Sequence, residues 1–134
     1  MPNTRYISSR VCSTRGVTRS ARCLVRRIIG RWDSGNSPEP LLTAWRSADV
    51  LPLARKLLHD TLAGPIAERV GAEFGVDNPV LRVELVASHL IGLAFARYQL
   101  RIEPIASTSV DDLVAWIGPT VQRYLTGPTP EPNS

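Results

Sequence analysis

The stretch NPVLRVELVASHLIGLAFARYQLRIEP, residues 78–104, decides the fold of this chain. Asn78 followed by Pro79 predicts a helix start, because asparagine caps free amides and proline has no amide to leave unpaired in the first turn. Pro104 predicts the end, because a residue that precedes a proline avoids the helical region. One helix of about 24 residues, roughly 36 Å long, is therefore expected between them.

Apolar residues cover this helix on two sides. At about 100° per residue, the first and wider arc consists of Val83, Ala87, Leu90, Ile91, Ala94 and Tyr98. The second arc consists of Leu85, Gly92, Phe95 and Ala96, flanked by Ser88 and His89. A helix that is apolar on more than one side needs to be covered on more than one side. Either it is the central helix of a bundle, or one face is kept for a partner chain that approaches closely at Gly92 and Ala96.

The run SHLIGLAFARYQLRIEPIASTSVDDLVAWIGPTVQRYLTG, residues 88–127, resembles the C-terminal end of tetracycline-repressor (TetR) family transcriptional regulators. The likeness is greatest to the subgroup with the signature G-L-A-x-x-R-Y-x-L-R-x-E-P-[LI]-A-S, which this chain carries from Gly92 to Ser107. It is weaker over residues 34–77 and absent before about Val25. The resemblance implies an effector-binding and dimerisation domain with no catalytic activity and no cofactor.

The resemblance also implies where the two sites lie. In such regulators the last two helices form the dimer interface, which corresponds here to residues 79–102 and 110–125, and the helices before them, residues 38–74, enclose a pocket for a small apolar effector. The predicted interface residues of a homodimer are Ala87, Ile91, Ala94, Tyr98, Leu113, Ile117 and Val121. The predicted pocket residues are Trp45, Leu57, Leu58 and His89. For Trp45 and His89, a purely structural role in the core is the alternative interpretation.

Other helical segments follow from periodicity and punctuation. Leu24, Ile28 and Trp32 share one face of a short amphipathic piece, and helical patterns also occupy residues 38–46 and 52–74, the latter interrupted at Pro65. Ser109 begins a last helix with an apolar stripe that ends near Gly127. The sequence therefore predicts an all-α helical bundle whose last two long, antiparallel helices pair with those of a second chain in a dimeric four-helix bundle.

Positive charge is concentrated at the N-terminus. Residues 1–33 hold eight arginines and one acid, whereas residues 34–134 hold seven arginines, one lysine and eleven acids. Residues 1–23 are interpreted as a basic, irregular leader, residues 24–127 as the helical domain and residues 128–134 as a proline-rich disordered tail. A basic arm that binds nucleic acid is an alternative, and its candidate residues are Arg15, Arg19, Arg22, Arg26 and Arg27.

The N-terminal segment does not match what the resemblance implies. A three-helix DNA-binding domain is expected before the regulator body, but residues 1–33 contain no helix-turn-helix pattern. DNA binding by this chain is therefore doubtful, and a truncated regulator, a transit peptide or a non-functional gene remnant are further interpretations of the leader.

Several function classes have no support in the sequence. The two cysteines, Cys12 and Cys23, do not have the spacing of a zinc site, although a disulfide between them is an alternative. No set of residues typical of an enzyme is present. Charged residues interrupt the longest apolar stretch and no secretory signal is visible, so we expect no membrane span and a cytoplasmic protein.

Overall fold

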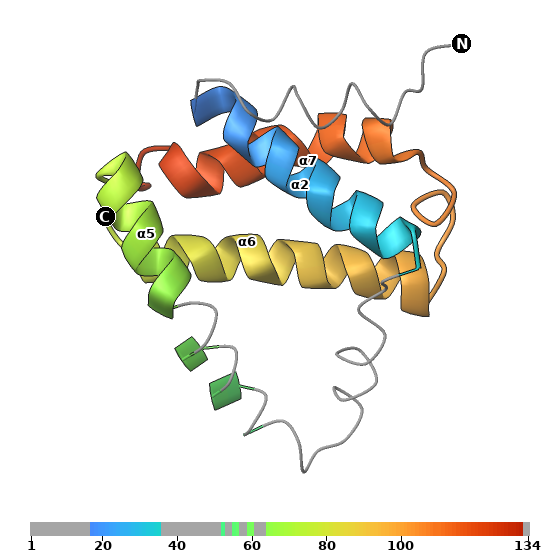
Figure 1. The fold of residues 1–134 in the computed structure, drawn as a ribbon, viewed down its shortest axis with the longest axis horizontal. Helices are drawn as coiled ribbons and strands as arrows, with labels where there is room; N and C mark the ends of the chain where they lie inside the picture. The colour runs from blue at the N-terminus through green and yellow to red at the C-terminus, as the bar shows by residue number, and fades with distance from the viewer. Residues whose placement is uncertain (1–16, 36–51, 53–54, 57–58, 61–63, 133–134) are drawn as a thin grey trace.

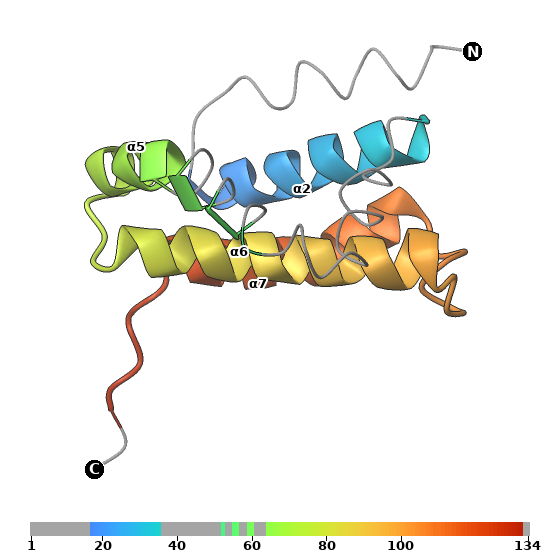
Figure 2. The same cartoon turned by 90° about the horizontal axis from the view of Figure 1, so that it is seen from below.

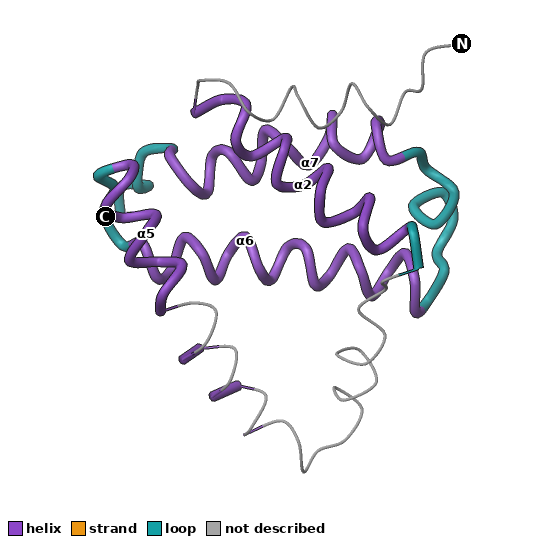
Figure 3. Tube along the Cα trace, viewed as in Figure 1, coloured by secondary structure: helices purple, strands orange, loops and turns teal. Residues whose placement is uncertain are grey.

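The computed structural model describes residues 17–35, 52, 55–56, 59–60 and 64–132. Throughout these residues the regular structure is helical, as the sequence predicts (Figure 3). Its elements are α2 (Val17–Asp33), α5 (Gly64–Phe74), α6 (Pro79–Ala94), the π-helix η2 (Phe95–Gln99) and α7 (Val110–Thr126). The helix predicted at residues 38–46 and most of residues 52–63 lie outside the described residues.

The helices form two layers, and one of these layers is an antiparallel pair. α6 continues directly into η2, and α7 runs back beside this long helix (Figure 1). α2 packs along α7, and α5 packs against the start of α6. Both α2 and α5 lie on the same side of the α6–α7 pair, as Figure 2 shows. The opposite side of the pair carries no further helix among the described residues.

The start and the buried face of α2 differ from the prediction. α2 begins at Val17, so residues 17–23 belong to the helical domain and not to the irregular leader. Its fully buried residues are Ala21, Val25 and Ile29, whereas Leu24 is 38% exposed. The predicted stripe was therefore displaced by one residue. Alanine at position 21 extends the true stripe by one turn, but so small a residue gives only a weak signal in an apolar pattern.

The core lies between α2 and α7. The predicted apolar stripe of the last helix is confirmed as its buried face, and its members are Leu113, Val114, Ile117, Val121 and Leu125, with Val110 packed at the edge. These residues pack in one cluster with Ala21, Val25 and Ile29 of α2, and Val86 and Leu90 of α6 complete this cluster. The same stripe that was expected to contact a second chain thus forms the core of one chain.

The ends of the helices are set mainly by the predicted residues. α5 begins at Gly64, which places Pro65 in its first turn, and Gly75 adopts φ 61° directly after the last turn of α5. Residues 61–63 lie outside the described residues, so the interruption at Pro65 stays a prediction. The Ser109 hydroxyl accepts a hydrogen bond from the Asp112 amide at 3.1 Å, which caps α7. The predicted start of α6 is confirmed, since the helix begins at Pro79 directly after Asn78. Asn78 itself lies in the left-handed region, however, and its side chain makes no capping hydrogen bond.

The end of the long helix and the C-terminal tail also depart from prediction. The long helix ends at Gln99, before the expected end at Glu103, and Arg101 then adopts φ 52°. The tail was expected to be disordered from residue 128, but the Thr129 hydroxyl is hydrogen-bonded to both Asp77 and Arg82. Cys23, which lies in α2, is disulfide-bonded, whereas Cys12 lies outside the described residues.

The long helix also has the length and composition of a membrane span. Pro79–Gln99 contains 21 residues with a mean hydropathy of 1.5, although the sequence was expected to contain no such segment. Arg82 and Arg97 are buried on this helix and are hydrogen-bonded to neighbouring segments of the chain. Core helices of globular proteins can have the same length and composition. This helix packs against α5 and α7 and contributes Val86 and Leu90 to the core, and 28% of its apolar window is buried.

We expect Gly118→Ala to destabilise the fold, because α2 passes so close to α7 at this position. A Cβ atom at residue 118 would lie 2.6 Å from Cγ of Arg22. Overpacking of this kind costs about 1–3 kcal/mol, which can be measured by urea denaturation. Gly30→Ala is the matched control, because no atom lies within 4 Å of its added Cβ and the helix should gain about 0.5–1 kcal/mol. An equal change in the free energy of unfolding for the two substitutions would contradict the close approach of α2 to α7 at Gly118.

Candidate functional site

An apolar strip runs along the uncovered side of α6. Leu81 and Leu85 are 54% and 38% exposed, and Phe95 at the start of η2 is 38% exposed. Ser88 and Gly92 lie between them and are also exposed. The spacing of these five residues alternates between four and three, which is the spacing of a seam between two helices. The small residues at its centre would allow another helix to approach closely.

Trp116 extends the apolar surface onto α7. It is 80% exposed, and it shares one strip of α7 with Thr120 and Tyr124 because these residues follow at intervals of four. The Tyr124 ring meets the His89 ring of α6 edge to face, with 6.0 Å between their centroids. The strip of α7 therefore borders α6. We call the exposed surface formed by Leu81, Leu85, Ser88, Gly92, Phe95 and Trp116 the α6–α7 face.

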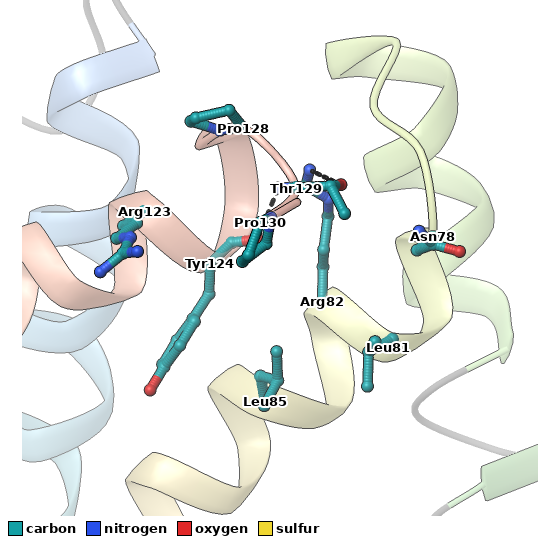
Figure 4. A pocket seen from close by; sticks show the side chains of 9 residues that line it. All are labelled: Asn78, Leu81, Arg82, Leu85, Arg123, Tyr124, Pro128, Thr129 and Pro130. Atoms are coloured by element: carbon teal, nitrogen blue, oxygen red, sulfur yellow. Dashed lines mark hydrogen bonds between the residues drawn. The ribbon is translucent and has the colours of Figure 1, made fainter. Parts of the chain in front are cut away.

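A small pocket lies at one end of this face, where α6 begins and α7 ends. Its volume is about 250 Å³, and its walls are Asn78, Leu81, Arg82, Leu85, Arg123, Tyr124, Pro128, Thr129 and Pro130. Figure 4 shows the Tyr124 ring projecting from α7 toward Leu85 on α6, with the residues of the tail closing the end of the pocket. The walls are mainly apolar, and two guanidinium groups lie at the edge.

Arg82 joins the two helices beside this pocket. Its side chain is 8% exposed, and it donates from Nε to the Asp77 carbonyl at 2.7 Å and from Nη1 to the Tyr124 carbonyl at 3.0 Å. Nη2 donates to Oδ1 of Asp77 at 2.8 Å and to the Thr129 hydroxyl at 3.3 Å. The Thr129 and Arg82 hydrogen bonds both lower the pKa of Asp77. This Arg82 cluster fixes the start of α6 against the end of α7.

Arg97 makes a similar cluster at the other end of the long helix. Its side chain is 7% exposed, and Nη1 donates to the Ile105 and Thr108 carbonyls, each at 2.7 Å. Nη2 and Nε donate to the two carboxylate oxygens of Asp33 at 2.9 and 3.2 Å, and the Tyr98 hydroxyl donates to Asp33 as well. The Arg97 cluster thus connects the last residue of α2, the π-helix η2 and the loop that precedes α7.

The Arg97 cluster shifts the pKa values of its members. Partial burial alone would raise the pKa of Asp33, but the hydrogen bonds from Arg97 and Tyr98 outweigh burial and leave this pKa below its ordinary value. The hydrogen bond to Asp33 raises the pKa of Arg97. Burial, together with the hydrogen bond to Asp33, raises the pKa of Tyr98. Asp33 and Arg97 therefore remain charged at neutral pH and Tyr98 remains protonated.

The predicted interface residues fall into two groups. Ala94, Leu113, Ile117 and Val121 are at most 7% exposed, so most of their surface is buried within one chain. Ala87, Ile91 and Tyr98 are half-buried. They lie on the other flank of α6 from Leu85 and Gly92, the residues of the second apolar arc. The arc that remains exposed is therefore the narrower of the two that the sequence contains.

The predicted pocket and arm residues are described only in part. Trp45, Leu57, Leu58 and Arg15 lie outside the described residues, as does the side chain of Arg19. His89 is half-buried against Tyr124, on the border of the α6–α7 face. Arg22 packs over Gly118, Arg26 is ion-paired with Asp111, and Arg27 is exposed. Two of the three described arginines therefore contact α7 rather than lying on a free basic arm.

Sequence reasoning missed both arginine clusters. Arg82 and Arg97 occur on the same side of the long helix as Val86, Leu90 and Ala94, and a charged residue among buried apolar residues usually has a buried partner. The place of these arginines among buried apolar residues could have indicated that each has a buried partner. The partner itself could not be identified, because Asp33 lies 64 residues away from Arg97 in the sequence and no local pattern connects the two.

One comparison with known proteins gives a match. Residues 19–125 match the family model described as "Tetracyclin repressor-like, C-terminal domain". No curated protein and no solved structure matches the chain. Among the residues that the structure describes, no three histidine, cysteine or acidic residues are grouped so that they would hold a metal ion.

We expect Asp33→Asn to lower the free energy of unfolding by about 1.5–3 kcal/mol at neutral pH, because hydrogen bonds to charged groups contribute about this much. The pKa of Asp33 is lower in the folded chain than in the unfolded chain, so its stabilisation is complete above the unfolded value of about 3.9. It is lost as the pH falls below that value. The wild type and the variant should therefore approach equal stability in denaturation experiments near pH 2.

Asp111→Asn is the control for this experiment. Asp111 also pairs with an arginine, but its side chain is 79% exposed, and exposed pairs contribute about 0–1 kcal/mol. A loss for Asp111→Asn as large as the loss for Asp33→Asn would contradict the special role of the Arg97 cluster.

Proposed function

Because this chain belongs to the family of tetracycline-repressor-like C-terminal domains, we propose that it is the dimerisation and effector-binding part of a transcriptional regulator. The family is not enzymatic, so the task of the domain is to bind a second chain and a small molecule. The observation that carries the proposal of a homodimer is the exposed α6–α7 face. We also expect the protein in the cytoplasm, where regulators of this family generally act.

The composition of the α6–α7 face supports a second copy of the chain as its partner. Leu81, Leu85, Phe95 and Trp116 are large apolar residues that a lone chain leaves in water, and contiguous apolar surface of this kind marks interaction sites. Two copies related by a two-fold axis would each bury the same surface. Four helices, two from each chain, would then surround a shared apolar seam.

The shape of the face favours close contact at its centre. Gly92 is exposed, and no atom lies within 4 Å of a Cβ built on it, so its position is open in the single chain. Ser88 lies one turn before it, and its hydroxyl is turned back to the Leu85 carbonyl at 2.9 Å. With both residues small and the serine hydroxyl satisfied, the backbone of a second α6 can approach at this point with little polar surface left unpaired.

We expect the effector to be a small apolar molecule bound by the segments between α2 and α6. The residues proposed for its pocket are those at positions 38–74, of which Trp45, Leu57 and Leu58 are outside the described residues. The pocket at the start of α6 is a poor alternative, because its volume of about 250 Å³ is below the roughly 300–1,000 Å³ of most small-molecule sites. His89 does not line that pocket, but its ring contacts the ring of Tyr124, which does.

A nucleic-acid-binding arm is the other function class that the sequence suggested, and the described contacts do not favour it. Arg22 and Arg26 direct their side chains to α7. Arg26 is already paired with an acid, which leaves less positive charge for phosphates.

We predict that Gly92→Glu prevents dimer formation without unfolding the chain. The substitution places a charge at the centre of the apolar face, and burial of an unpaired charge against a second chain is strongly unfavourable. Gly30→Glu is the matched control, because Gly30 is also helical and no atom lies within 4 Å of its added Cβ, but it belongs to α2. Light scattering across a concentration series should give a dimer for the wild type and the control, and a monomer for Gly92→Glu.

Circular dichroism should show equal helix content for the three proteins, which separates a loss of pairing from a loss of folding. A wild type that stays monomeric at every concentration would overturn the proposed dimer. A dimer that persists in Gly92→Glu would place the interface on a different surface.

A further inference from the structure

We propose that Trp116 of each chain inserts into the small pocket of the other chain, between Leu85 and Tyr124, so that two reciprocal contacts flank the two-fold axis. This inference rests on the proposed dimer and specifies its main contact. Neither the family match nor the pattern of the sequence assigns a role to Trp116.

Trp116 needs a partner more than any other exposed apolar residue in the described part of the chain. Its exposed fraction of 80% is the largest among these residues, which otherwise range from 38% to 54%. A tryptophan side chain buries about 150–250 Å² when it is packed. Tryptophan is also among the residues that most often dominate the binding energy of an interface.

The pocket has the chemistry to receive an indole ring. Leu81, Leu85 and Tyr124 supply apolar walls, as Figure 4 shows, and Pro128 and Pro130 close the end near the tail. Arg123 belongs to the lining as well, and its side chain points away from Leu81 and Leu85 (Figure 4). The volume of about 250 Å³ is small for a metabolite but adequate for one aromatic side chain.

The pocket is also built on a fixed frame. Arg82, which forms part of the wall, is held by Asp77, the Tyr124 carbonyl and Thr129. The Arg82 cluster therefore keeps the start of α6, the end of α7 and the tail together before any partner arrives. A preformed pocket binds a side chain with a smaller entropic cost than one that must be ordered on contact.

Two-fold symmetry brings the ring and the pocket together. α6 and α7 are antiparallel, and the bond from Arg82 to the Tyr124 carbonyl aligns the start of one with the end of the other. Trp116 precedes Gly118 at the middle of α7, whereas Tyr124 follows it. A two-fold axis at the level of Thr120, which is four residues from Trp116 and four from Tyr124, exchanges the levels of these two residues, because residue i contacts residue j and j contacts i. The partner's Trp116 then lies over Tyr124, which lines the pocket.

The test is a double-mutant cycle on the full chain, read out as the dimer dissociation constant from sedimentation equilibrium. The variants are Trp116→Ala, Leu85→Ala and the double variant, with Phe95→Ala as a third truncation on the same face. Because Trp116 and Leu85 are exposed in the single chain, neither truncation removes a core residue. Circular dichroism on each variant verifies that the helices are retained.

We expect Trp116→Ala to weaken dimerisation by about tenfold or more, since truncation of an interface tryptophan commonly costs over 1.4 kcal/mol. The effects of Trp116→Ala and Leu85→Ala should be non-additive, because the two residues contact each other across the interface. Trp116→Ala and Phe95→Ala should combine additively.

Each other outcome overturns the inference in a recognisable way. Additive effects of Trp116→Ala and Leu85→Ala in a stable dimer would exclude the contact while leaving the proposed dimer intact. An unchanged dissociation constant for Trp116→Ala would do the same. A wild type without any dimer would overturn both this inference and the proposed function.

Discussion

The buried guanidinium of Arg97 is the constraint on which the rest of the structure depends. A charge in the interior is tolerated only when it is paired and hydrogen-bonded, and Arg97 meets this condition with the Asp33 carboxylate and two loop carbonyls. Those partners come from the end of α2 and from the loop before α7. The arginine therefore fixes the lateral position of α2 and the direction in which α7 returns. Arg82 does the same for the opposite end of the pair.

The division between core and interface follows from this arrangement. Since the arginines fix both ends of the α6–α7 pair, α2 lies along α7 and covers the broad apolar stripe that includes Ile117 and Val121. Gly118 makes this possible, because a larger residue would collide with Arg22. What stays exposed is the narrower strip that contains Leu85 and Gly92. A second chain would therefore meet a surface with small residues at its centre and large ones near its ends.

Local features of the fold could be predicted from the sequence because they depend on neighbouring residues. The start of α6 at Pro79, the cap at Ser109 and the stripe of α7 were all correct. The phase of α2 was not, because Ala21 is too small to stand out. Four of the predicted interface residues are buried within one chain, for a different reason. A helical wheel identifies apolar arcs, but it cannot tell which arc is covered by the same chain, and the helix that covers Ile117 begins in a segment that read as an irregular leader.

Folding and association of this domain depend on different residues. Core positions such as Ile117 are 7% exposed, so a charged residue there would unfold the chain before it could report on pairing. Gly92 and Trp116 contribute nothing to the core that α2 covers, and changes at these positions act on the surface alone. If the domain pairs as proposed, the dimer is assembled from chains that are already folded, because the contacts that fix α2, α6 and α7 all lie within one chain. Association then depends on a surface whose residues can vary without loss of the fold.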